Sequence, residues 1–194
     1  MKIGALVLAA GGSARLGQPK QLLQYRGQSL VRRAAEAALN AGCSPVAVVA
    51  GERREEIAAT LRGLSVMIVP NENWERGIGG SIRVGVEALK SCAALIILAC
   101  DQPHLTVDLI RALVDKHEET NRPIIASAYA GTLGVPALFV HDCFERLLSL
   151  DDKQGAKSII LAQPNDVAQV AFPDGAVDID TPNDLESWQT GSQL

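Results

Sequence analysis

Short, uninterrupted apolar runs alternate with segments of helical periodicity along this chain, and that alternation limits the folds it can adopt. Apolar runs occupy residues 4–10, 46–50, 66–69 and 95–100, and helical periodicity occupies residues 29–42, 52–62 and 79–90. Strands that are apolar on both faces are typical of parallel sheets covered by helices on each side. We therefore predict an α/β fold: a single domain of three αβα layers around a Rossmann-like, mostly parallel sheet.

Capping residues refine the boundaries of these elements. Ser29 is expected to cap the first helix and Gly42 to end it. The second half is less regular, with a helix from about Thr106, strands at 124–128 and 136–140, and helices at 144–150 and 155–162. Residues 167–172 are expected to pair at or near a sheet edge, and Thr181-Pro182 is typical of a further helix start.

The composition bears mainly on partners and location. The 194 residues carry a net charge of −4 without a basic tract, which disfavours nucleic acid as the main partner. The longest apolar run, residues 93–100, is too short to cross a bilayer, and the apolar N-terminus runs into a glycine turn, which favours a first strand over a signal peptide. The cysteines form no CxxC or Cys/His pair, so we expect reduced thiols in a cytoplasmic protein without a membrane partner (Cys43, Cys92, Cys100 and Cys143).

Two segments follow directly on predicted strands, where open α/β sheets bind their ligands. The first segment covers residues 9–20. Its glycines allow the backbone to approach a phosphate closely, and its Arg15 and Lys20 would neutralise a triphosphate. The segment is not a Walker P-loop, because Gly17 is followed by Gln18, and it lacks the GxGxxG pattern of a dinucleotide site. The alternative is a glycine-rich surface turn with two solvated cations.

The second segment, residues 99–104, contains Asp101 immediately after the apolar run that ends at residue 100. A carboxylate at this edge of the sheet is suited to hold a divalent ion that bridges the phosphates of a nucleoside triphosphate. Asp178 and Asp180 alternate along a further predicted strand, and one of them could complete the metal site. The alternatives are a turn or cap role for Asp101 and a solvated role for Asp180.

Residues 71–82 form a third polar segment, in which three glycines open a predicted helix. We expect these glycines to expose free N–H donors and Ser81 to add a hydroxyl, which together could orient a base, a ribose or a phosphate. Trp74 is expected to pack against this loop rather than to stack on a base. The three histidines are scattered and have no ligand spacing.

Taken together, these segments resemble the NTP-transferase family with a glycosyltransferase-A-like fold, in particular its molybdenum cofactor cytidylyltransferase branch. Residues 8–20 match the family's Leu-Ala-Ala-Gly-x-Ser-x-Arg-Met-Gly-x-Pro-Lys pattern, with Leu16 in place of Met. Residues 71–82 resemble its second nucleotide loop, residues 100–103 its metal-binding turn, and residues 178–185 its Asp-x-Asp-Thr-Pro-x-Asp-Leu stretch. The matches follow the family order and cover nearly the whole chain.

The resemblance implies Mg²⁺-dependent transfer of a nucleoside monophosphate to a phosphorylated acceptor, with residues up to about 105 binding the nucleotide and residues from about 106 the acceptor. Arg15, Lys20 and Asp101 would be catalytic, and Asp101 and Asp180 would hold Mg²⁺. Ala10, in place of the Gly of guanylyl enzymes, favours CTP over GTP. The implied nucleotide-binding residues are Leu8, Ala9, Ala10, Gly11, Gly12, Ser13, Gly17, Asn71, Gly79, Gly80 and Ser81.

Two departures from the family pattern lie in the acceptor half. Gly134-Val135-Pro136 stands where the family commonly has Gly-His-Pro, and residues 151–157 depart from Gly-Asp-x-Gly-Ala-Arg. The resemblance implies molybdopterin as the acceptor and a molybdenum hydroxylase as the client enzyme. The alternatives are a sugar- or polyol-phosphate nucleotidyltransferase and a non-catalytic chaperone that handles a cofactor.

Overall fold

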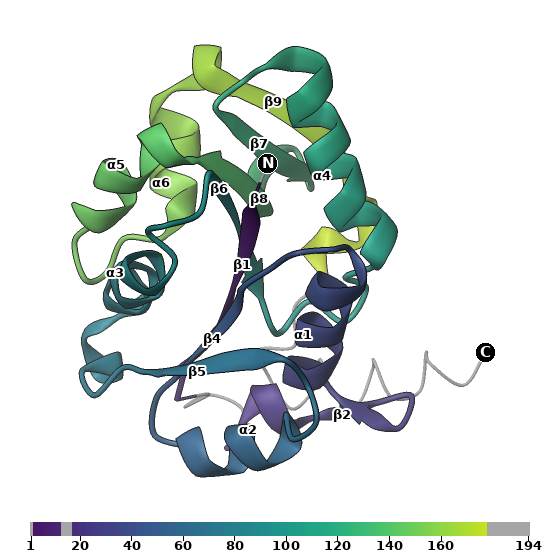
Figure 1. Cartoon of the computed structure of the whole chain (residues 1–194), viewed down its shortest axis with the longest axis vertical. Helices are drawn as coiled ribbons and strands as arrows, with labels where there is room; N and C mark the ends of the chain where they lie inside the picture. Colours follow the sequence, from purple (N-terminus) through teal and green to yellow (C-terminus); the bar gives the residue numbers. More distant parts are fainter. Residues whose placement is uncertain (1, 13–16, 178–194) are drawn as a thin grey trace.

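A seven-stranded sheet in the order β5-β4-β1-β6-β8-β7-β9 runs through the protein (Figure 1). The structure, a computed structural model, describes residues 2–12 and 17–177. The strands are β1 (Ile3–Ala9), β4 (Val46–Ala50), β5 (Val66–Pro70), β6 (Ala94–Ala99), β7 (Ile124–Tyr129), β8 (Thr132–Val140) and β9 (Val167–Ala171). Only β8 runs antiparallel to its neighbours, which confirms a mostly parallel sheet.

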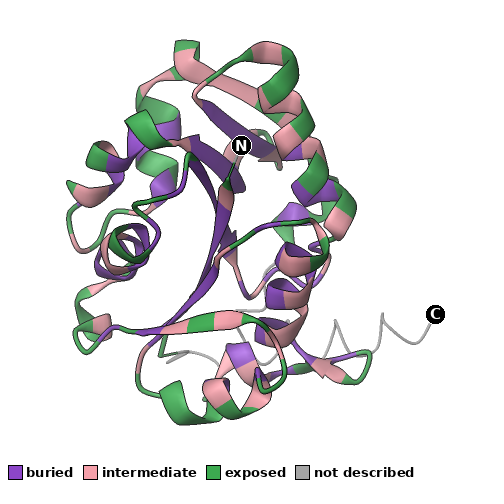
Figure 2. Cartoon of the chain, viewed as in Figure 1, coloured by how far each residue is buried: buried purple, intermediate pink, exposed green. Residues whose placement is uncertain are grey.

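Helices cover both faces of this sheet and complete the three predicted layers (Figure 1). One face carries α1 (Leu30–Asn40), α2 (Arg54–Thr60) and α4 (Val107–Thr120), and the other carries α3 (Ile78–Ala88), α5 (Phe144–Leu148) and α6 (Ala156–Ala162). The central strands are buried on both sides, whereas the edge strand β5 is largely accessible (Figure 2). Burial on both faces explains why the central strands are uninterrupted apolar runs.

The predicted Ser29 cap is confirmed, the predicted Thr181 cap lies outside the described residues, and several boundaries are corrected. Ser29 accepts a hydrogen bond from the amide of Arg32 at 3.4 Å, and Thr106 accepts one from Leu109 at 3.1 Å. The helix predicted at 52–62 is shorter, since a turn closed by the Gly51 carbonyl and the Arg54 amide precedes it. The strand predicted at 136–140 begins earlier, at Thr132, and forms a hairpin with β7.

Several short elements lie outside the pattern that the sequence predicts. A two-stranded hairpin pairs β2 (Gln24–Tyr25) with β3 (Gln28–Ser29). Short 3₁₀ helices are η1 (Lys20–Leu22), η2 (Trp74–Arg76), η3 (His141–Cys143), η4 (Pro164–Asp166) and η5 (Pro173–Ala176). Among the described residues, no helix combines the length and the apolar character needed to cross a membrane. The four cysteines are free and buried, as expected.

The order of the strands brings the two predicted site segments together. β1 and β6 are parallel neighbours, and Leu8 pairs with Ala99 at their carboxyl ends. The glycine segment that follows β1 and the acidic turn that follows β6 therefore meet at one edge of the sheet. This edge is where doubly wound sheets bind their ligands.

Candidate active site

A cavity of about 570 Å³ opens at the carboxyl ends of β1 and β6. Its volume falls within the range of small-molecule sites, about 300–1,000 Å³. One wall comes from the glycine segment after β1, a second from η2 and the start of α3, and a third from β7, β8 and the start of α6. Elements from both halves of the chain thus enclose the same space.

Lys20 and Asp101 meet at this cavity. The Lys20 Nζ lies 3.5 Å from Asp101 Oδ2, and their side chains are 15% and 30% exposed. Lys20 starts η1 after the glycine segment, and Asp101 follows β6 directly. The structure therefore places a cation and a carboxylate together beside one cavity, as a site for a phosphate chain and a divalent ion requires.

The glycine segment forms the wall next to this pair. Leu8, Ala10, Gly11 and Gly12 line the cavity, whereas Ala9 is buried beneath them. The buried amide of Gln21 donates hydrogen bonds to the carbonyls of Ala9, at 3.0 Å, and Gly11. Gln21 therefore holds the loop in shape from behind, a role that the sequence analysis missed although Gln21 directly follows Lys20.

Trp74 was expected to pack against its own segment, residues 71–82, and the structure places its ring against Gly12 and Gly51. A Cβ on Gly12 would lie 2.6 Å from the indole ring, and a Cβ on Gly51 would also lie 2.6 Å from it. Ordinary van der Waals contact begins at about 3.4 Å, so the ring occupies the space that both glycines leave open. The glycine at position 12 is therefore explained by this packing. Gly17 is exposed and lies outside the cavity lining, with a φ of 71°.

Asn71 and Ser81 are joined by a buried hydrogen bond, from Asn71 Nδ2 to Ser81 Oγ at 3.0 Å. Asn71 also accepts a hydrogen bond from the amide of Asn73 at 3.0 Å, and it lies outside the cavity lining, whereas Ser81 lines the cavity. The expectation of free N–H donors is wrong for Gly79, because its amide donates to the carbonyl of Asp152 at 2.9 Å. Gly79 and Gly80 also lie outside the cavity lining.

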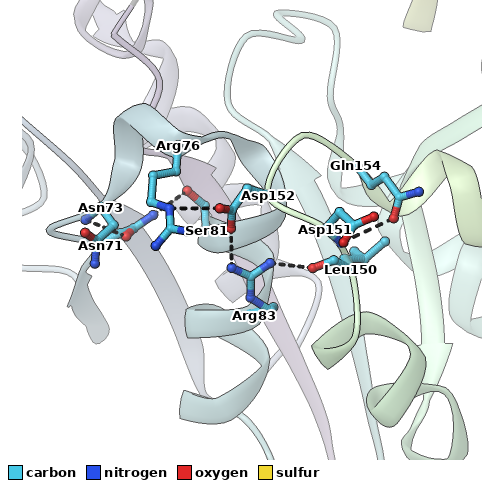
Figure 3. A network of polar contacts seen from close by, with 9 residues as sticks. All are labelled: Asn71, Asn73, Arg76, Ser81, Arg83, Leu150, Asp151, Asp152 and Gln154. Atoms are coloured by element: carbon cyan, nitrogen blue, oxygen red, sulfur yellow. Dashed lines mark hydrogen bonds and ion pairs between the residues drawn. The ribbon is translucent and has the colours of Figure 1, made fainter.

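The loop between α5 and α6 is fastened to this segment by Asp152 (Figure 3). Its carboxylate accepts from Arg76 Nε at 2.9 Å and from Arg83, whose guanidinium also donates to the carbonyl of Leu150. The hydrogen bond from Arg83, followed by the charge of Arg76, holds the pKa of Asp152 below its usual value. Backbone and side chain of Asp152 therefore tie the α5–α6 loop to η2 and α3.

The wall contributed by β7, β8 and α6 was not predicted residue by residue. Tyr129, Gly134 and Val135 come from the β7–β8 hairpin, and Ala156 and Lys157 come from the start of α6. A Cβ on Gly134 would lie 2.3 Å from the Tyr129 hydroxyl, which explains the glycine there. Gly134, Val135 and Lys157 belong to the two segments that depart from the family pattern, and both line the cavity.

The match to known proteins decides the family. The model of the MobA-like NTP transferase domain matches residues 5–167. The chain belongs to the MobA-like NTP transferase family. The purine catabolism protein PucB of Bacillus subtilis is 31% identical over 193 residues, with 92% of each chain covered. Membership in this family makes the chain a nucleotidyltransferase.

Other members of the family carry different names. The nicotine blue oxidoreductase of Paenarthrobacter nicotinovorans is 35% identical over 135 residues, 69% of this chain and 65% of that protein. The molybdenum cofactor cytidylyltransferase of Escherichia coli is 25% identical over 184 residues, 94% and 93% of the two chains. Rv0371c of Mycobacterium tuberculosis superposes with a TM-score of 0.85 at 26% identity over 98% of each chain, and a manganese complex of that protein is known.

One of the predicted ligands of a divalent ion lies among the described residues, and the second lies outside them. Asp101 offers a carboxylate at the cavity, and Mg²⁺ in nucleotide enzymes is commonly held by one or two carboxylates together with substrate phosphates. No group of three or more acidic, histidine or cysteine side chains forms a metal cluster within residues 2–12 and 17–177. Asp180 and its rival Asp178 lie outside those ranges, as do Ser13 and Arg15.

Cys100 also lines the cavity but is unsuited to nucleophilic catalysis. Burial raises the pKa of its thiol, and the adjacent charge of Asp101 raises it further. The reactive form of cysteine is the thiolate, which these surroundings disfavour. Cys100 is therefore not a candidate nucleophile in this cavity.

Proposed function

We propose that this protein transfers CMP from CTP to a phosphorylated acceptor, with molybdopterin as the acceptor, and releases pyrophosphate. The convergence of Lys20 and Asp101 at a cavity bordered by the glycine loop carries this proposal. The E. coli relative that is named a molybdenum cofactor cytidylyltransferase supports the choice of acceptor and nucleotide, since the match covers nearly all of both chains. The buried, free cysteines fit a reducing compartment, and we propose the cytoplasm.

The nucleotide is proposed to lie along the wall formed by Leu8, Ala10, Gly11 and Gly12. In this arrangement Lys20, with Arg15 from the same loop, neutralises the triphosphate as pyrophosphate leaves. An oxygen of the acceptor phosphate attacks the α-phosphorus of CTP, a new P–O bond forms, and the bond to the β-phosphate bridging oxygen breaks. A phosphate monoester is largely ionised near neutral pH, so no protein base is required.

Asp101, with Asp180 proposed as the second ligand, would hold Mg²⁺ beside the phosphates. The ion would supply further neutralisation of phosphate charge. Ser13, Gly17, Asn71, Gly79 and Gly80 remain proposals for nucleotide binding. Asn71 and Gly79 act through the hydrogen bonds that hold the loop around Ser81 and the start of α3.

The preference for CTP is proposed to depend on Ala10, which lines the cavity and is 7% exposed. A methyl group there narrows the space beside the base relative to the glycine of guanylyl enzymes. One methyl group in a pocket is worth about 1–3 kcal/mol of discrimination, so GTP is disfavoured rather than excluded. The expected signature is a higher kcat/KM for CTP than for GTP, reduced by Ala10→Gly.

The test is pyrophosphate release with Mg²⁺, each nucleotide in turn, and a panel of acceptors. The panel holds molybdopterin, sugar phosphates and polyol phosphates, and the product is identified by mass. A CMP adduct of molybdopterin supports the proposal, whereas faster transfer to a sugar or polyol phosphate, or a preference for GTP, contradicts it. Tight nucleotide binding without turnover on any acceptor would indicate a non-catalytic chaperone.

If transfer to molybdopterin is found, a client is implied, because the product is a dinucleotide cofactor that another enzyme must take up. We propose a molybdenum hydroxylase. Co-purification of the protein with such an enzyme, retained with the product and lost without it, is the corresponding measurement.

A further inference from the structure

We propose that Lys157 binds the anionic group of the acceptor, and that Asp152, together with Arg76 and Arg83, is the positioning residue that holds Lys157 at the cavity. This inference rests on the proposed function, because it requires an anionic acceptor in this cavity. It assigns roles to the loop between α5 and α6, where the sequence departs from the family pattern.

The charges around the cavity single out Lys157. The charged side chains among its described lining residues are Lys20, Glu75, Asp101 and Lys157. Lys20 and Asp101 face each other at 3.5 Å on the nucleotide side. Lys157 lies on the wall from the acceptor half and makes no ion pair with any residue in the described ranges. Its ammonium is therefore available to a ligand.

Two arginines near the same loop are unsuited to this role. Arg76 and Arg83 both donate to Asp152, and Arg83 donates in addition to the carbonyl of Leu150 (Figure 3). Neither arginine lines the cavity. A guanidinium whose donors are committed to a carboxylate would have to break that pair before binding an anion, whereas Lys157 would not.

The position of Lys157 within α6 argues against a purely structural role. It is the second residue of the helix Ala156–Ala162, which has no acidic residue in its first turn. A cation in the first turn of a helix is opposed by the positive end of the helix dipole. The charge of Lys157 therefore does not stabilise the helix, which disfavours a structural role for this charge.

Asp152 controls where α6 begins. Its carbonyl accepts from the amide of Gly79, and its carboxylate binds one arginine from η2 and one from α3. Residues 151–154 close a turn, in which Asp151 and Gln154 exchange hydrogen bonds of 3.0 and 3.2 Å. Gly155, directly after this turn, is the N-cap of α6 and lines the cavity. Fastening the turn to α3 thus fixes the distance between Lys157 and the nucleotide wall.

The experiment measures CMP transfer to molybdopterin by Lys157→Met, with Lys153→Met as the matched control. Both are exposed lysines of one short segment and both changes remove one positive charge, but only Lys157 lines the cavity. We expect Lys157→Met to raise the acceptor KM about tenfold, as the loss of a charge-assisted hydrogen bond predicts. The KM for CTP should change less than about twofold, and Lys153→Met should leave both values unchanged.

The role of Asp152 is tested by Asp152→Ala in the wild-type protein and in Lys157→Met. Positioning predicts a raised acceptor KM in the first background and no further rise in the second, since the residue that is positioned is already absent. Glu36→Ala is the stability control. The Glu36 carboxylate is 26% exposed, against 25% for Asp152, and it also accepts hydrogen bonds from two side chains. Glu36 lies on α1, however, and not in the loop before α6. Glu36→Ala should lower Tm without raising the acceptor KM.

The outcomes separate this inference from the proposed function. Absence of transfer by the wild-type protein overturns both. Transfer by the wild-type protein, with equal acceptor KM values for Lys157→Met and Lys153→Met, overturns only the role of Lys157. Equal effects of Asp152→Ala in the two backgrounds overturn the positioning role, because a general loss of stability adds to the other substitution whereas a positioning effect does not.

Discussion

Gly79 and Gly80 are neighbours in the first turn of α3, yet the structure predicts opposite effects when each is replaced by alanine. In a helix, alanine is normally more favourable than glycine by roughly 0.5–1 kcal/mol. At Gly80 the nearest atoms to an added Cβ lie at 3.8 and 3.9 Å, which is ordinary van der Waals contact. Gly80→Ala should therefore stabilise the protein by up to about 1 kcal/mol.

At Gly79 the same methyl group has no space. Its Cβ would lie 2.0 Å from the carbonyl oxygen of Asp151 and 2.9 Å from that of Gln154, both backbone atoms that cannot rotate away. Overpacking typically costs about 1–3 kcal/mol, and loss of the hydrogen bond from Gly79 to Asp152 adds about 0.5–1.5 kcal/mol. After the gain in helix propensity is subtracted, Gly79→Ala should destabilise the protein by about 0.5–4 kcal/mol.

Urea unfolding of both variants measures this difference directly. The gap of about 1–5 kcal/mol between them corresponds to roughly 2–20 °C in Tm for a chain of this length. A Gly79→Ala protein as stable as Gly80→Ala would refute the close approach of the α5–α6 loop to α3. It would also remove the structural basis for the positioning role of Asp152.

Three further outcomes are expected. Lys20→Ala and Arg15→Ala should lower kcat by about 10²–10³-fold, as for a lost oxyanion donor, while Tm is retained. Near wild-type rates would refute phosphate binding by this loop. Asp101→Asn should abolish Mg²⁺-dependent turnover, and Asp180→Asn should weaken it. Titration of the folded variants with Mg²⁺ measures both effects. An unchanged Mg²⁺ requirement in Asp180→Asn would show that Asp180 is not a metal ligand. Burial raises the pKa of Cys43 from 9.0 to about 11, so the folded protein keeps a proton that the unfolded chain releases. Stability should then fall as pH rises from about 9 towards 11, and at pH 8 the native thiols should resist a disulfide reagent that titrates all four after unfolding.

The fold was predictable in its first half because the strands there are buried on both faces. Val46–Ala50 is entirely apolar, and its observed limits equal the predicted ones. The two hairpins were harder to predict from the sequence. Their two-residue turns, Arg26-Gly27 and Ala130-Gly131, have positive φ at both positions, but only the glycine is a residue typical of such turns. The strand after the second turn also contains Gly134 and Pro136, which disfavour a strand in any sequence-based argument.

The candidate site was predictable to the extent that it depends on strand order. A doubly wound sheet makes β1 and β6 neighbours, so the meeting of Lys20 with Asp101 follows from the positions of two apolar runs. The acceptor wall does not follow in this way. Tyr129 reaches the cavity from the end of β7, which is placed by its pairing with the antiparallel strand β8, and Lys157 follows the loop held by Asp152. No local pattern in the sequence predicts which long-range partner the Asp152 carboxylate takes.

The glycines of the two polar segments have a common physical explanation that the sequence pattern conceals. Gly12 and Gly51 leave room for Trp74, and Gly77 and Gly79 leave room for the backbone of residues 151–154. At Gly77 the φ of 138° adds a backbone requirement to the steric one. Gly12, Gly77 and Gly79 were interpreted as positions where the backbone meets a ligand, yet each is also required by a protein neighbour. A substitution at any of them is therefore expected to disturb both the packing and the site, and only paired variants, such as Gly79→Ala with Gly80→Ala, can separate the two effects.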